Sequence, residues 1–115
     1  MKKLILIPIL LLVVFVANAH NPNKLIIVKT KIYCDHCLQC GSCGENIETY
    51  IKKNAGVKKV TVNPTANTIS VVYDDSKTTK LKIQESLRKA GFEADGQMPT
   101  VKAYNALDGC CKKPE

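Results

Sequence analysis

Apolar residues alternate with polar residues along three stretches of the chain, which is the pattern of strands with one buried face. The alternation is clearest at every second residue from Ile26 to Ile32, and it predicts a strand over residues 25–32. The same period predicts two further strands, over residues 57–62 and 69–73. The Asn-Pro-Thr-Ala-Asn segment between these two favours a turn, so we expect them to form a hairpin.

Between the strands, apolar residues recur every three to four positions, which predicts two amphipathic helices. The first is expected after Gly44, because Ile47 and Ile51 then share one face. The second is expected to start at Thr79 as its N-cap and to end before Gly91. Its apolar face consists of three residues, Ile83, Leu87 and Ala90.

A short last strand over residues 92–94 completes the order β-α-β-β-α-β. This order predicts an α+β fold of the ferredoxin-like type, a sandwich in which a four-stranded antiparallel sheet carries two helices on one face. We expect one domain over residues 24–96. Residues 97–115 are expected to form a C-terminal tail that contains a weakly helical stretch, 101–107, and a Cys-Cys pair.

Residues 1–19 have the composition of an export signal that is later removed. A short basic start, Lys2-Lys3, precedes an apolar run over residues 4–16, and Ala17-Asn18-Ala19 is a cleavage site of the A-x-A kind. The run is too short to span the ~30 Å hydrocarbon core of a bilayer as a helix. We therefore expect a periplasmic or secreted protein with no stable membrane insertion after signal removal.

The formal charge of the chain is +7, from 17 basic and 10 acidic residues. The excess is spread along the chain as lysine, with a single arginine, Arg88, and no tryptophan. Nucleic-acid-binding proteins cluster arginine with stacking aromatic residues, so no nucleic-acid partner is expected. Two histidines and no paired carboxylates in a defined motif leave little for general acid–base chemistry, and we do not expect an enzyme.

Cysteine carries the strongest chemical signal in the composition. Four of the six cysteines recur at every third position in one short segment, Cys34, Cys37, Cys40 and Cys43, and the others are Cys110 and Cys111. In an exported chain an even cysteine count is typical of disulfides. A disulfide stabilises mainly by closing a long loop, which cysteines so close together do not do with one another. The cluster is therefore interpreted as a metal site rather than as a set of disulfides.

Thiolates are soft ligands that select Cu(I), Zn(II) and similar thiophilic ions over Mg(II) or Ca(II). Cys40 and Cys43 are the first candidate ligands, because Cys43 adjoins the first turn of the expected helix, where free N–H groups favour a thiolate. Cys34 and Cys37 are expected to complete a closed four-sulfur site. Three secondary candidates lie in the same loop or in the tail: His36, Cys110 and Cys111.

The stretch CGSCGENIE, from Cys40 to Glu48, resembles the heavy-metal-associated domain family, and so do GVKKV at residues 56–60 and KAGF at residues 89–92. The family pattern is M-x-C-x-x-C with an aliphatic residue four positions after the second cysteine, and Leu38 stands here in place of the methionine. A Gly-Val follows the first helix of the family, and an Ala-Gly-aromatic sequence follows the second. Counted from Cys43, these features fall in the register of the family.

The resemblance implies a ferredoxin-like fold and assigns the metal-binding pair of the family to Cys40 and Cys43, with Cys34 and Cys37 as an insertion in the loop. The family includes copper chaperones, the N-terminal domains of copper- and zinc-exporting ATPases, and periplasmic mercury-binding proteins. The implied cargo is Cu(I) or Zn(II) in the first place, with Hg(II) and Cd(II) as further soft ions. The implied partner is a metal transporter or efflux component, and the implied function is metal sequestration or transfer.

Two other function classes stay open at this point. A thiol–disulfide redox protein would cycle the C-x-x-C pairs, although the chain lacks the tryptophan that commonly precedes this motif in thioredoxin-type enzymes. An iron–sulfur carrier would use the same run of cysteines, but Cys43 is not followed by the proline of the bacterial ferredoxin pattern.

Overall fold

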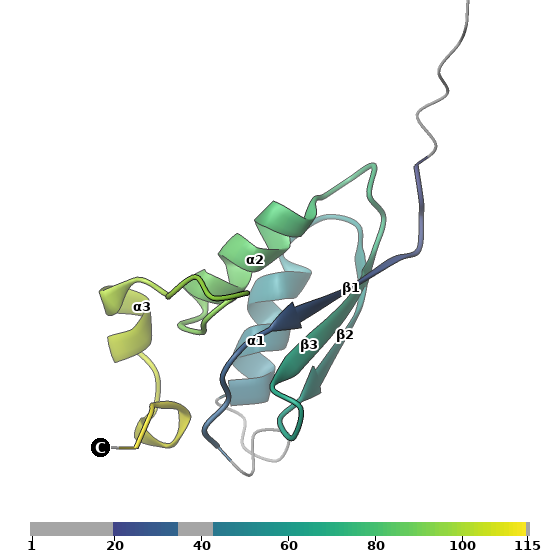
Figure 1. Cartoon of the computed structure of the whole chain (residues 1–115). Coiled ribbons are helices and arrows are strands. Elements are labelled where there is room, and N and C mark those ends of the chain that lie inside the picture. The colour runs from purple at the N-terminus through teal and green to yellow at the C-terminus, as the bar shows by residue number, and fades with distance from the viewer. Residues whose placement is uncertain (1–19, 35–42, 115) are drawn as a thin grey trace, which may run out of the picture.

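The structure of the chain is a computed structural model that describes residues 20–34 and 43–114. The expected export signal therefore lies outside the described residues. The elements are β1 Lys24–Lys29, α1 Cys43–Lys52, β2 Val57–Asn63, β3 Thr68–Tyr73, α2 Lys80–Lys89 and α3 Val101–Asn105, with a 3₁₀ turn over Gly109–Cys111 (Figure 1). Within the described ranges, no helix combines the length and the apolar character needed to cross a bilayer.

β3 lies in the centre of a three-stranded antiparallel sheet, between β1 and β2. The hairpin expected from residues 57–62 and 69–73 is present, and Thr68 at the start of β3 pairs with Asn63 on one neighbour and with Lys29 on the other. The helices α1 and α2 pack against each other over one face of the sheet (Figure 1). The prediction of an α+β fold with an antiparallel sheet and helices is therefore confirmed.

The core lies between this face of the sheet and the two helices. It contains the apolar faces predicted for β1, α1 and α2: Ile26, Val28, Ile47, Ile51, Ile83, Leu87 and Ala90. Leu25 and Ile27 alternate with the buried residues of β1 and point away from the core. Thr79 is the N-cap of α2, as predicted, because its hydroxyl accepts a hydrogen bond from Lys82 N at 3.3 Å.

The fourth strand expected over residues 92–94 does not form in the part of the chain that the structure describes, so this detail of the ferredoxin-like prediction is wrong. Ala94 makes only an isolated bridge with Gln97, because Asp95, with φ 47°, and the glycine after it, with φ 86°, reverse the chain at once. The segment nevertheless lies beside β1. Lys29 N donates to Asp95 Oδ1 and Asp95 N donates to Lys29 O, both at 2.8 Å. A carboxylate thus substitutes for one backbone acceptor of a strand ladder.

The C-terminal tail packs back onto the end of α2. The weakly helical stretch forms α3, where the Thr100 hydroxyl caps the helix by accepting a hydrogen bond from Ala103 N at 3.2 Å. Arg88 Nε on α2 donates to Met98 O at 2.8 Å. Leu107, which follows α3, is buried in the core. The tail is therefore attached to the domain by polar and apolar contacts.

Gly91 is the point where the tail meets α2. Its φ of +101° supports the prediction that it stands just past the end of the helix. A Cβ at this position would lie 2.8 Å from both Ala103 O and Leu107 Cγ. Gly91 therefore serves a second purpose that the sequence pattern did not indicate, because it lets the tail approach closely.

We expect Gly91→Ala to lower the free energy of unfolding by about 2–4 kcal/mol, from the left-handed backbone and from the displaced tail together. Gly96→Ala is the matched control, because Gly96 has φ +86° and its added Cβ would meet nothing within 4 Å. Gly96→Ala should lower the free energy of unfolding by about 1–2 kcal/mol, the contribution of the left-handed backbone alone. Urea unfolding of both variants measures the difference, and equal losses would contradict the close packing of the tail.

Candidate metal centre

Three sulfur atoms converge at the N-terminal end of α1. The Sγ atoms of Cys34, Cys43 and Cys110 all lie within 4.8 Å of one another. Cys34 comes from the segment after β1, Cys43 is the first residue of α1, and Cys110 belongs to the 3₁₀ turn of the tail. Zn–S bonds of ~2.3 Å in a tetrahedral site place ligand sulfurs ~3.8 Å apart, so small side-chain rotations would bring this group within coordinating range.

Cys111 brings a fourth sulfur to the cluster through a disulfide with Cys43. The two residues are 68 positions apart in sequence, and their Cα atoms lie 6.0 Å apart. The Sγ atom of Cys110 is 4.0 Å from that of Cys111. The expectation that the clustered cysteines form no disulfides is therefore wrong for Cys43, because its partner comes from the tail and not from the cluster. In this oxidised form, Cys43 offers no thiolate to a metal.

Asn67, in the turn between β2 and β3, positions the segment that carries Cys34. Its side-chain Oδ1 accepts a hydrogen bond from Ile32 N, and its backbone oxygen accepts one from Thr30 N, both at 2.9 Å. Asn67 has φ 52°, a left-handed conformation that asparagine tolerates better than most residues. Because β3 starts only at residue 68, β1 loses its strand partner at this point and the asparagine takes over the pairing. This explains why β1 is shorter than the predicted strand.

Cys43 stands at the end of α1 that carries the positive pole of the helix dipole. It is fully buried at the first position of a ten-residue helix. Unpaired N–H groups and the positive end of the helix dipole face an anion at this end. Glu45 in the same first turn also interacts favourably with the dipole. Lys31, which flanks the loop in sequence, pairs with Glu93 at 3.5 Å.

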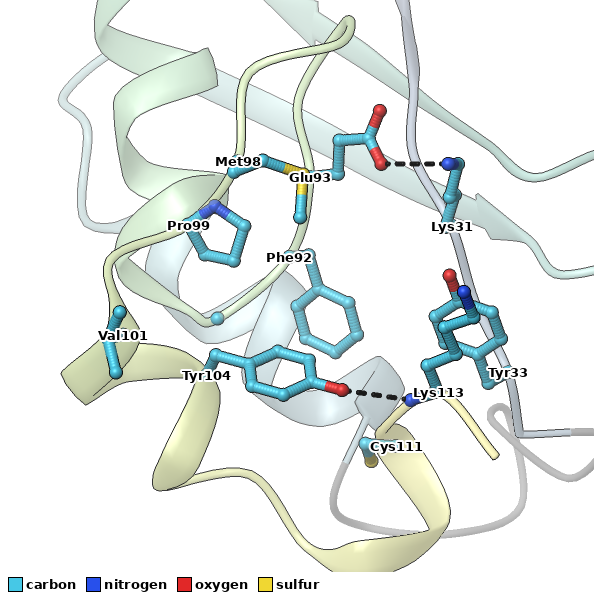
Figure 2. Close-up of a pocket in the computed structure, with 11 residues that line it drawn as sticks. Lys31, Tyr33, Phe92, Glu93, Met98, Pro99, Val101, Tyr104, Cys111 and Lys113 are labelled. Atoms are coloured by element: carbon cyan, nitrogen blue, oxygen red, sulfur yellow. Dashed lines mark hydrogen bonds and ion pairs between the residues drawn. The ribbon is translucent and has the colours of Figure 1, made fainter. Parts of the chain in front are cut away.

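The tail is folded so that Cys111 faces the domain. Cys111 N donates to Asp108 O at 2.9 Å within the 3₁₀ turn. Two residues later, Lys113 N donates to the Tyr104 hydroxyl at 3.1 Å, which ties the end of the tail to α3 (Figure 2). Cys111 is only 2% exposed, and Phe92 beside it is equally buried. The disulfide is therefore shielded from bulk solvent on most sides.

The structure brings together four of the candidate ligands: Cys34, Cys43, Cys110 and Cys111. The other three, His36, Cys37 and Cys40, lie outside the described residues. The ligand set stays a prediction. Sequence reasoning missed Asn67 and Tyr104 as positioning residues, and the turn composition around Asn67 is the only signal that could have indicated the first.

The sequence pattern of the heavy-metal-associated domain matches residues 36–93, which is half of the chain. The chain belongs to the heavy-metal-associated domain family. Among curated proteins, Copper-transporting ATPase 1 of Rattus norvegicus is 35% identical over 57 residues, which make up 50% of this chain and 4% of that protein. This chain therefore spans only a small part of the length of that relative.

Solved structures with the same fold include oxidised MerP from Ralstonia metallidurans CH34, with 24% identity and a TM-score of 0.53 over 63% of this chain and 93% of that chain. A copper binding domain from HMA7, a P-type ATPase, has 28% identity and a TM-score of 0.51 over 61% of this chain and 88% of that chain. The family match includes Cys43 but neither Cys34 nor the tail. The cluster therefore combines one residue of the family region with three cysteines outside it.

We expect Asn67→Ala to destabilise the protein by about 2–4 kcal/mol, because it leaves Ile32 N without its acceptor and forces alanine into a left-handed conformation. Asn67→Gly also lacks the acceptor, but glycine adopts the left-handed conformation without strain. Its free energy of unfolding should therefore lie between those of the parent and the alanine variant. In both variants Cys34 should be alkylated faster than in the parent, as followed by peptide mass spectrometry. Parent-like alkylation of Cys34 would show that Asn67 does not position it.

Proposed function

We propose that this chain is an exported protein that binds a soft metal ion through cysteines at the start of α1, for sequestration or transfer. Cu(I) and Zn(II) are the first candidate ions, followed by Hg(II) and Cd(II), because thiolates prefer thiophilic ions. The protein acts as a metal-binding module and not as an enzyme. Membership of the heavy-metal-associated domain family supports metal binding, and the sequence of residues 1–19 supports export to the periplasm or secretion.

The convergence of Cys34, Cys43 and Cys110 within 4.8 Å is the observation that carries this proposal. Cys34 is 9% exposed and Cys43 is fully buried, whereas Cys110 is exposed, so a bound ion would be shielded on the side of the domain and open on the side of the tail. Cys40, the family partner of Cys43, precedes it by three positions in sequence and adds a further sulfur to the proposed set. Three or more sulfur ligands favour a closed, strongly binding site over one with an open position.

The proposed partner is a metal transporter or efflux component. Support comes from two relatives whose names mention copper and an ATPase, Copper-transporting ATPase 1 and the copper binding domain of HMA7, a P-type ATPase. A metal-carrying protein in the same compartment would deliver its ion to such a transporter or take up an ion from one. The additional cysteines of the tail would strengthen binding and slow release, which favours sequestration over rapid transfer.

The Cys43–Cys111 disulfide gives specific support to a second candidate, a thiol–disulfide redox protein. In that case the cycling pair is Cys43 with Cys111, in place of the C-x-x-C pairs expected from sequence. Insulin reductase activity and a measured reduction potential separate the two functions, since a metal carrier needs no turnover of its disulfide.

The metal-binding prediction is tested on the fully reduced protein, with native mass spectrometry for stoichiometry and chelator competition for affinity. We expect Cys40→Ser with Cys43→Ser to abolish stoichiometric binding of Cu(I) or Zn(II). Cys34→Ser alone should weaken binding at least about tenfold, a loss typical of changes around a metal site. If the double variant binds the ion as tightly as the parent, Cys40 and Cys43 are not the metal-binding pair.

Cys111→Ser is the matched control for this experiment. Like the Cys43 variant it cannot form the Cys43–Cys111 disulfide, but it keeps the thiol of Cys43 at the helix end. Because all proteins are reduced in this test, Cys111→Ser controls for the general effect of a cysteine-to-serine change next to Cys43. Retained binding in Cys111→Ser, with lost binding in the double variant, assigns the loss to the ligands themselves.

A further inference from the structure

A cavity of about 310 Å³ lies next to the buried disulfide (Figure 2). Its walls come from the segment after β1, the turn after α2, α3 and the end of the tail. Phe92, Met98 and Tyr104 provide much of an apolar lining, and Cys111 forms part of the wall. Cys43, the other half of the disulfide, does not line the cavity. The cavity wall therefore includes one residue of the disulfide and not the other.

Apolar side chains are exposed around this cavity to an unusual degree. Six large apolar residues are exposed in the part of the chain that the structure describes, and three of them, Tyr33, Met98 and Val101, border this one cavity. Val101 is 76% exposed and Met98 is 65% exposed. Clustered exposed apolar surface rimmed by polar groups is typical of a binding site. The lining thus favours a ligand with an apolar body.

Charge at the rim favours a ligand that also carries an anionic group. Lys31 and Lys113 line the cavity together with a single carboxylate, Glu93, so the rim has a net positive charge. Glu93 pairs with Lys31 at 3.5 Å. Lys113 is exposed and forms no ion pair within residues 20–34 and 43–114. An anion entering the cavity would therefore meet Lys113.

Burial restricts how the disulfide can be reduced. Cys43 is fully buried and Cys111 is 2% exposed, so a thiol cannot reach either sulfur across the open surface. Attack on a disulfide depends on which sulfur is accessible and on how well the other leaves. Cys111 lies in the cavity wall, so a small displacement of the wall would expose it to a thiol in the cavity, and Cys43 at the start of α1 would leave as a thiolate stabilised by the helix end.

We propose that the cavity admits a small thiol with an apolar body and a carboxylate, which opens the Cys43–Cys111 disulfide. The thiolate of this ligand attacks Cys111 Sγ, a mixed disulfide forms between ligand and Cys111, and Cys43 is released as a thiolate. A second molecule of the same thiol attacks the ligand sulfur, releases Cys111 as a thiolate and leaves as the ligand disulfide. Two electrons thus pass from two thiols to the protein, whose two sulfurs become thiols after protonation.

Opening of this bond returns Cys43 to the cluster with Cys34 and Cys110. The consequence for metal binding rests on the proposed function, whereas the exchange reaction does not. The oxidised protein would be a closed form, and the thiol ligand would convert it to the form that binds the ion. The two proposals fail separately, because disulfide opening is measured without metal and metal binding is measured on protein that is already reduced.

The test uses the oxidised full chain without metal and compares mercaptopropionate, mercaptoethanol and cysteamine as anionic, neutral and cationic probes. Rates are expressed per thiolate and followed by alkylation of released thiols. We expect mercaptopropionate to react about tenfold faster than cysteamine, as electrostatic steering allows, with the mixed disulfide on Cys111. Lys113→Glu should abolish this preference. Lys102→Glu is the matched control, because it changes the net charge by the same amount at an exposed position on α3 that does not line the cavity. This variant should still react faster with mercaptopropionate than with cysteamine.

Val101→Trp tests access through the cavity. Val101 borders the cavity at 76% exposure, and Leu81, at 75% exposure, lies outside it. Val101→Trp should slow the reaction with mercaptopropionate several-fold, while Leu81→Trp should react like the parent. Both positions are exposed, so both variants should fold. A mixed disulfide on Cys43, equal rates for all three probes, or opening only by a protein dithiol reductase would each overturn the proposal.

Discussion

The bond between Cys43 and Cys111 is the constraint on which both the cysteine cluster and the cavity depend. It joins the first turn of α1 to the tail across 68 positions of sequence. Closing a loop of that length stabilises the folded chain by about 4 kcal/mol, by restricting the unfolded state. The bond and the other contacts of the tail together hold Cys110 beside Cys34. The contacts of Leu107 with the core give the tail a second attachment, which does not depend on the redox state.

Electrostatic repulsion decides which states of the cluster are stable. Several thiolates within 4.8 Å of one another repel strongly, and burial of Cys34 and Cys43 leaves little water to screen them. The repulsion is relieved when two sulfurs form a disulfide, when protons stay on the thiols, or when a soft cation neutralises the group. The N-terminus of α1 stabilises one thiolate but not three. An ionised, reduced and empty cluster is therefore the least stable arrangement of these sulfurs.

Local patterns in the sequence were sufficient for most of the fold and for only part of the site. Periodicity located the buried faces of β1, α1 and α2, because burial of an element follows from its own spacing of apolar residues. It failed at residues 92–94, where the turn at Asp95 and the residue after it prevents a ladder. Periodicity could not identify the disulfide partner of Cys43, since disulfide connectivity cannot be deduced from spacing alone. The role of Asn67 depends on a contact between elements that are distant in sequence.

In the two proposals a metal ion and the disulfide compete for the sulfur of Cys43, so the proposals are linked thermodynamically. An ion that binds only the reduced protein stabilises that form by RT ln(1 + [M]/Kd), about 2.7 kcal/mol when the free ion is at 100 times its Kd. For a two-electron couple this corresponds to about 60 mV in the reduction potential of the Cys43–Cys111 bond. Linkage also acts in the other direction, so an oxidising compartment lowers the apparent affinity for the ion by the factor 1 + [oxidised]/[reduced]. Under both proposals, the buried disulfide would set the metal affinity of the cluster by the supply of thiol.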